Sequence, residues 1–168
     1  INVGDTYNGV TLASGFGGLD FSKSLVGALN AGKIALTAVA PATANISLNP
    51  DGTYKTVGVT NATVSKIVVD SVTNQVTDAY TQGGSLQTAV YDEEGFASTG
   101  GSLSVTNIHA DLVNKKIFVD IVGANGVGTL TNYYLWDIIG VPAVAPTATK
   151  PGVPAIAPIT GVTTWAEG

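Results

Sequence analysis

The feature that most restricts the fold of this chain is a series of three strand-like stretches joined by short turns between residues 102 and 138. Residues 102–113, 116–122 and 127–138 are rich in Val, Ile, Thr and aromatic residues, which favour β-strands. The connecting sequences Asn114-Lys115 and Ala124-Asn125-Gly126 are typical of turns. The pattern predicts an antiparallel three-stranded meander.

The alternation of apolar residues changes phase within the first of these stretches. Leu103 and Val105 have odd numbers, whereas Ile108 and Ala110, further along, have even numbers. Side chains of a regular strand alternate between its two faces, so one extra residue moves all later side chains to the opposite face. We therefore predict a β-bulge near Asn107.

Most other stretches before residue 141 also favour strands. Strands are predicted over residues 10–14, 45–48, 54–59, 62–72, 75–81 and 86–91, whereas the glycine-rich segments 15–18 and 123–128 are interpreted as turns and bulges. Residues 22–31 instead place Leu25 and Leu29 on one helical face. Ser22 is expected to cap this helix and Gly32 to end it in a left-handed conformation, while Pro41 limits any extension towards residue 39.

These patterns predict a mainly β protein, either an antiparallel sandwich or a sheet packed with one short helix. Residues 15–140 would form the β-rich core domain, with the helix near residues 22–31, and residues 1–14 an extended N-terminal strand or arm. Residues 141–168 contain five of the seven prolines. Because proline cannot donate a hydrogen bond to a sheet, this segment is expected to be an extended C-terminal arm. It would lie over its own sheet or on a neighbouring subunit.

The composition favours an exported protein that associates with itself. The chain has no cysteine and no methionine, so we expect Ile1 to follow removal of an N-terminal signal and the protein to be extracellular or at the cell surface. Charged residues make up 11% of the chain, and the net charge is −5. Such a surface gives little repulsion between copies, and it does not suit nucleic acid. No apolar run approaches the roughly 20 residues that span a membrane.

Few residues suggest catalysis or a metal site. His109 is the only histidine, and with no cysteine it cannot complete a zinc site, so no enzyme is expected and His109 is interpreted as a hydrogen-bonded sheet residue. Asp92, Glu93 and Glu94 form the densest acidic cluster. Carboxylates on one loop suit Ca²⁺, although a solvated turn is the alternative interpretation. No other cofactor is expected.

Aromatic and glycan-related signals support a second hypothesis. Tyr133, Tyr134 and Trp136 form a cluster in which Tyr134 and Trp136 would share one face of a strand. Such a platform can stack on sugar rings, whereas core packing is the alternative. Asn45 and Asn61 lie in N-glycosylation acceptor patterns, whose use depends on the source organism.

Several segments are similar to a known group of proteins. They are Gly-Gly-Ser-Leu-Ser-Val-Thr-Asn at 100–107, the stretch from Asp111 to Ile121, Asn-Gly-Val-Gly at 125–128, Leu-Trp at 135–136, Phe-Ser-Lys-Ser-Leu at 21–25, and Gly-Lys-Ile-Ala-Leu at 32–36. Together these segments, about a third of the chain, resemble exported β-rich surface proteins of Gram-negative bacteria, many of which carry a C-terminal PEP-CTERM sorting signal. The resemblance implies a surface or matrix location and supplies no active site.

The leading functional hypothesis is a structural subunit that assembles with its own copies into a filament, pilus-like fibre or surface matrix. A terminal strand passed between subunits would supply the contact. The residues expected at subunit contacts are Val10, Leu12, Val153, Ile156, Ile159 and Trp165. Val10 and Leu12 would fill a groove, while the proline-rich arm would wrap or brace the neighbour. The alternative is a monomeric surface adhesin or carbohydrate-binding module that uses Tyr133, Tyr134 and Trp136.

Overall fold

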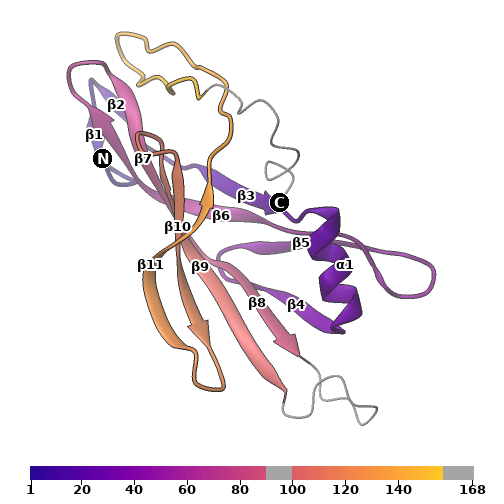
Figure 1. Ribbon diagram of the computed structural model, residues 1–168. Coiled ribbons are helices and arrows are strands. Elements are labelled where there is room, and N and C mark those ends of the chain that lie inside the picture. Colours follow the sequence, from indigo (N-terminus) through magenta and orange to yellow (C-terminus); the bar gives the residue numbers. More distant parts are fainter. Residues whose placement is uncertain (90–99, 157–168) are drawn as a thin grey trace.

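The computed structural model describes residues 1–89 and 100–156 of the chain, which are mainly β with one helix (Figure 1). This confirms the fold class predicted from the sequence. The elements in chain order are β1 (Thr6–Tyr7), β2 (Val10–Thr11), β3 (Phe16–Asp20), α1 (Lys23–Ala31), β4 (Ile34–Val39), β5 (Thr43–Leu48), β6 (Tyr54–Asp70), β7 (Gln75–Gln82), β8 (Gly84–Ala89), β9 (Gly101–Asp111), β10 (Lys116–Gly123) and β11 (Gly128–Asp137). Within the described residues, α1 is too short to cross a bilayer, and no longer apolar helix is present.

The main sheet has nine antiparallel strands, of which the two long ones, β6 and β9, each pair with different partners along their length. β6 pairs with β5 through residues 54–60 and with β7 through residues 63–70. β9 pairs with β8 through residues 101–106 and with β7 through residues 109–111. The sheet therefore divides into a smaller half-sheet (β3, β5 and the first part of β6) and a larger half-sheet (β4, β8, β9, β10 and β11), joined through β7 (Figure 1).

The bulge predicted near Asn107 is present. Asn107 has a φ of 54°, and the β9–β10 register shifts between the pair Phe118–His109 and the pair Asp120–Thr106. Asparagine is one of the residues that adopt positive φ most readily. Asn61 has a similar φ of 58° but lies within β6, which is therefore one strand where the sequence predicted two.

Helix α1 begins as predicted and ends differently. The Ser22 hydroxyl accepts a hydrogen bond of 3.2 Å from the Leu25 backbone amide. Gly32 closes the helix with a φ of −82°, and Lys33 takes the left-handed conformation, with a φ of 49°. The chain then continues into β4 rather than extending the helix.

The core lies where α1 covers β4 and β6. Val26 and Leu29 of the helix pack with Leu36, Val57 and Val59, and each of these five side chains is less than 8% exposed. A buried aliphatic side chain contributes about 1.5–3 kcal/mol through removal from water. This cluster therefore fixes α1 against the smaller half-sheet and β4.

Strand β3 lies where the sequence predicted a glycine-rich turn, and that prediction was wrong. Gly17 pairs with Ala62, and after a register shift Leu19 pairs with Val59. A Cβ atom on Gly18 would lie 3.1 Å from the Val59 carbonyl oxygen, so glycine permits the close approach of β3 to β6. Pairing with a long neighbouring strand outweighs the low strand propensity of glycine.

Both ends of the described chain fold back onto the β6–β7 region. The N-terminal ammonium group of Ile1 donates a 2.9 Å hydrogen bond to the Ile67 carbonyl oxygen, and β1 and β2 form a small hairpin nearby. In the C-terminal segment, Val141 bridges to Ile156, and the Gly152 amide donates to the Asn74 carbonyl oxygen. The described part of this arm therefore lies on its own chain.

Candidate functional site

β3 and β11 are the two ends of the longest strand path in the main sheet, and each has an edge without a strand partner in the described part of the chain. The other edge strands are β4, which pairs with β8, and β5, which pairs with β6. β3 pairs with β6 on one side, and β11 pairs with β10 on one side. An unpaired strand edge presents free backbone N–H and C=O groups that can bind an added strand. The space between β3 and β11 is therefore a candidate binding site.

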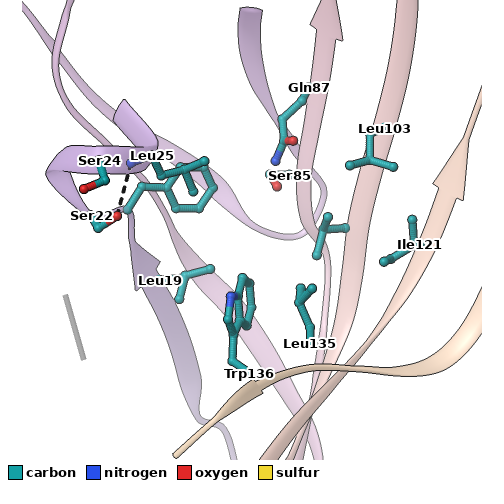
Figure 2. A pocket seen from close by; sticks show the side chains of 12 residues that line it. Leu19, Ser22, Ser24, Leu25, Ser85, Gln87, Leu103, Ile121, Leu135 and Trp136 are labelled. Carbon is teal, nitrogen blue, oxygen red and sulfur yellow. Dashed lines mark hydrogen bonds between the residues drawn. The ribbon is translucent and has the colours of Figure 1, made fainter. Parts of the chain in front are cut away.

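A cavity of about 460 Å³ lies in this space, between the two half-sheets and the start of α1 (Figure 2). Leu19 of β3 and Trp136 of β11 reach into it from these two edge strands (Figure 2). The complete lining is Leu19, Phe21, Ser22, Ser24, Leu25, Ser85, Gln87, Leu103, Val105, Ile121, Leu135 and Trp136. Its volume falls in the range typical of ligand sites.

The register of β10 explains why one face of the larger half-sheet is apolar. Ile117, Val119 and Ile121 alternate along β10 and share one face, with Val119 completely buried. Ile121 pairs with Val105 of β9, so both side chains lie on the face that lines the cavity. This face extends the apolar core to the edge of the sheet.

The β11 register brings two neighbouring residues into the cavity. Trp136 pairs with Ile117, whereas Tyr134 pairs with Phe118, so Leu135 is an extra residue between two consecutive positions of β10. This bulge places Trp136 on the cavity side and Tyr134 on the opposite face. The expectation that Tyr134 and Trp136 share a face was therefore wrong, because the alternation is interrupted at Leu135.

Polar groups in the cavity are few and uncharged among the described lining residues. The Ser22 hydroxyl already caps α1. Ser85 is 4% exposed and lies on β8, where it is the register partner of Val105 on β9. Gln87 and Ser24 complete the polar part of the lining. The cavity thus offers an apolar surface with a few hydrogen-bonding groups, which suits an apolar side chain carried on a polar backbone.

The opposite face of the sheet carries an aromatic row: Tyr80 of β7, His109 of β9, Phe118 of β10 and Tyr134 of β11. Their ring centroids are 4.1, 5.5 and 6.0 Å apart along the row. Lys66 lies 5.2 Å above the Tyr80 ring at one end, and at the other end the Lys116 ammonium lies 4.1 Å from the Tyr134 ring. The first two contacts are stacked and the third is tilted by 59°, so the row links four neighbouring strands.

His109 is held by both of its ring nitrogens. Nε2 lies 2.8 Å from the Asp78 carboxylate, and Nδ1 lies 3.2 Å from the Asn132 side-chain oxygen. Burial, followed by the negative charges of Asp78 and Asp111, raises the pKa of Tyr80 above its ordinary value. This geometry agrees with the interpretation of His109 as a hydrogen-bonded sheet residue.

The other residues singled out from the sequence lie in several places. Tyr133 pairs with Val119 and is 47% exposed, so it is separated from the Tyr134 face. Val10 and Leu12 line a hollow of about 230 Å³ in their own chain, next to Ile67. Val153 bridges to Val144, Ile156 is 4% exposed, and Asn45 and Asn61 are exposed.

The remaining predicted residues, Asp92, Glu93, Glu94, Ile159 and Trp165, lie outside the described residues. Within the described ranges no group of three or more acidic or histidine side chains is arranged to hold a metal ion. The cavity lining was missed in the sequence because it depends on β3, whose glycines hide its strand character. Comparisons with protein-family models, curated proteins and solved structures found no match.

Proposed function

We propose that this protein is an extracellular structural subunit that assembles with its own copies into a filament, pilus-like fibre or surface matrix. The observation that carries the proposal is the apolar cavity between β3 and β11, two strands whose outer edges have no strand partner among the described residues. A strand from a neighbouring subunit would bind the free edges through its backbone and the cavity through its side chains.

The geometry of such a contact favours an open chain of subunits. The cavity and any donated terminal segment are different surfaces of one molecule, so the contact is head-to-tail rather than self-complementary. Head-to-tail contacts that do not close into a ring continue into a fibre. A contact of this type needs no second kind of protein.

Surface composition supports association as well. Phe16 lies on the edge strand β3 and is 66% exposed. Only 11% of the residues are charged, which leaves little electrostatic repulsion between copies. A strand edge without a partner is a feature that isolated soluble domains usually protect.

The alternative proposal, a monomeric adhesin or carbohydrate-binding module, has less support in the arrangement of the aromatic residues. Tyr134 packs against Phe118 and Lys116, and Trp136 lines the cavity on the other side of the sheet. Tyr133 and Tyr134 are 47% and 42% exposed, but they lie on opposite faces of β11. Three side chains on different surfaces do not form one stacking platform.

Negative-stain electron microscopy of the purified chain, with light-scattering mass measurement on the same sample, tests the proposal. We expect ordered fibres, or species well above the 16.9 kDa subunit mass. Leu135→Glu should prevent assembly, because it places a carboxylate in the apolar cavity. Leu130→Glu is the matched control: Leu130 lies on the same strand, is 38% exposed and does not line the cavity. A monodisperse monomer at every concentration would refute the proposal and lead to a glycan-binding screen.

A further inference from the structure

We propose that the segment received by the cavity is residues 159–165 of a neighbouring copy, Ile-Thr-Gly-Val-Thr-Thr-Trp, an inference that rests on the proposed function. The cavity would then be completed by a second copy of the same chain. Three features of the chain support this assignment: the position of Ile156, the composition of the segment that follows it, and the contacts of the N-terminal segment.

The described chain ends beside strand β11. Ile156 is 4% exposed, and its amide and carbonyl groups form hydrogen bonds of 3.0 Å with the carbonyl and amide groups of Val141. Val141 follows the end of β11 by four residues, and Leu135 and Trp136 near that end line the cavity. The remaining residues therefore start near the rim of the strand edge that they would bind.

The remaining segment has suitable length and composition. Twelve residues follow Ile156, and an extended chain covers up to about 3.3 Å per residue, or roughly 40 Å. Pro158 is the last proline, and residues 159–165 carry no charge and contain strand-favouring Ile, Val, Thr and Trp. Although the arm as a whole is rich in proline, this part can pair with a strand edge and supply Ile159 and Trp165, which would share one strand face, to an apolar cavity.

The N-terminal segment, the other possible donor, is already bound to its own chain. The Val3 amide donates to the Ser65 carbonyl oxygen over 3.1 Å, and the Ile67 amide donates to the Ile1 carbonyl oxygen over 2.9 Å. Val10 and Leu12 also line a hollow together with Ile67 of the same chain. Donation of this segment would require these contacts to break first.

The anchoring of the connection favours a neighbouring copy over the same chain. Neighbouring strands of one molecule are most often joined by about two to five residues, and the longest such connection between consecutive paired strands here, between β8 and β9, has eleven. Here residues 138–158 separate β11 from the segment, and part of this connection is held against the β6–β7 turn through Gly152 and Asn74. A long connection anchored away from the cavity is suited to reaching the next subunit.

Cysteine cross-linking tests the inference directly, because the chain has no native cysteine. One copy carries Leu135→Cys in the cavity, and a second copy, with a different affinity tag, carries Ile159→Cys. Mixing the two copies under assembly conditions and oxidising them should join one to the other. Leu130→Cys replaces Leu135→Cys in the matched control. Proximity in the assembled state should give about tenfold or more mixed cross-link relative to the control.

A chain that carries both substitutions, diluted into excess unsubstituted chain, separates the two possible sources of the segment. Cross-linking within that one chain would overturn the inference, since the segment would then occupy its own cavity. Equal mixed cross-linking at Leu130→Cys and Leu135→Cys would also overturn it.

Deletion of residues 159–168 distinguishes this inference from the proposed function. We expect the shortened chain to keep its β-sheet circular dichroism and to lose assembly. Fibres formed by the shortened chain would overturn the C-terminal donor while leaving the structural function in place. Failure of the intact chain to assemble would refute the proposed function and this inference together.

Discussion

The imidazole ring of His109 lies face to face with the phenol ring of Tyr80, with centroids 4.1 Å apart and planes inclined by 9°. The two residues are register partners on β9 and β7. The pairing of β7 with β9 involves three residue pairs, and it joins the two half-sheets. This stacked pair therefore reinforces the shortest strand contact along the main path of the sheet.

Replacing His109 with alanine should weaken the junction between the half-sheets. The change removes the stack on Tyr80 and leaves the Asp78 carboxylate without its 2.8 Å partner. We expect a loss of about 2–3 kcal/mol in the free energy of unfolding, measured by urea denaturation. Val72→Ala, at a side chain that is 92% exposed, should change it by less than about 0.5 kcal/mol. Equal effects of the two substitutions would show that His109 does not stabilise the junction.

Two glycines should respond oppositely to alanine. Gly84 lies at the buried start of β8, where a Cβ atom would overlap the Val105 carbonyl oxygen. Gly27 lies on the exposed face of α1, where a Cβ atom would meet nothing within 4 Å. We expect Gly84→Ala to cost at least about 2 kcal/mol or prevent folding, and Gly27→Ala to add up to about 1 kcal/mol. Thermal melts of both variants test this, and a tolerated Gly84→Ala would contradict the packing of β8 on β9.

Turn carboxylates should make the protein less stable in acid. The Thr73 and Val72 amides donate to Asp70 and lower its pKa below the ordinary value. At Asp111, burial acts in the opposite direction, but hydrogen bonds from the Asn114 side chain and backbone produce a net lowering of the pKa. Because the folded-state pKa values lie below the unfolded ones, the stabilisation is present above about pH 4 and is lost as the pH falls through the folded values.

The measurement is the urea midpoint as a function of pH, for the unsubstituted chain and for Asp70→Ala. The unsubstituted chain should lose stability between about pH 4 and pH 2. Asp70→Ala should be less stable at pH 7 and should depend less on pH below 4. Val72→Ala should keep the full pH dependence, since the Val72 amide remains. Parallel curves for Asp70→Ala and the unsubstituted chain would rule out this carboxylate as a source.

Local patterns were enough to predict several parts of the fold. The meander, the bulge at Asn107 and the Ser22 cap all follow from signals within about a dozen residues. Alternation, turn sequences and capping side chains act over that distance, so the sequence expresses them directly. The apolar face of β10 can be predicted in the same way, because it follows from the alternation of apolar residues along one strand.

The cavity depends on relationships that no local pattern contains. Leu19 and Trp136 are 117 positions apart and line one cavity because β3 and β11 are the two ends of the longest strand path in a curled sheet. Trp136 also changes face through the extra residue Leu135, which the regular alternation does not reveal. Strand order and bulges in partner strands are set by packing between distant segments, and these features decide which side chains share a site.

An apolar fluorescent dye should bind the cavity of the unassembled subunit. The lining is apolar except for Ser and Gln side chains, and the volume of about 460 Å³ accommodates a small aromatic molecule. Dye titration should give a saturable increase in fluorescence, and Leu135→Glu should weaken binding by about tenfold or more, because the apolar dye must displace water from a buried carboxylate. Leu130→Glu should bind the dye as the unsubstituted chain does. Equal binding by both variants would place the dye, and the accessible apolar surface, somewhere other than between β3 and β11.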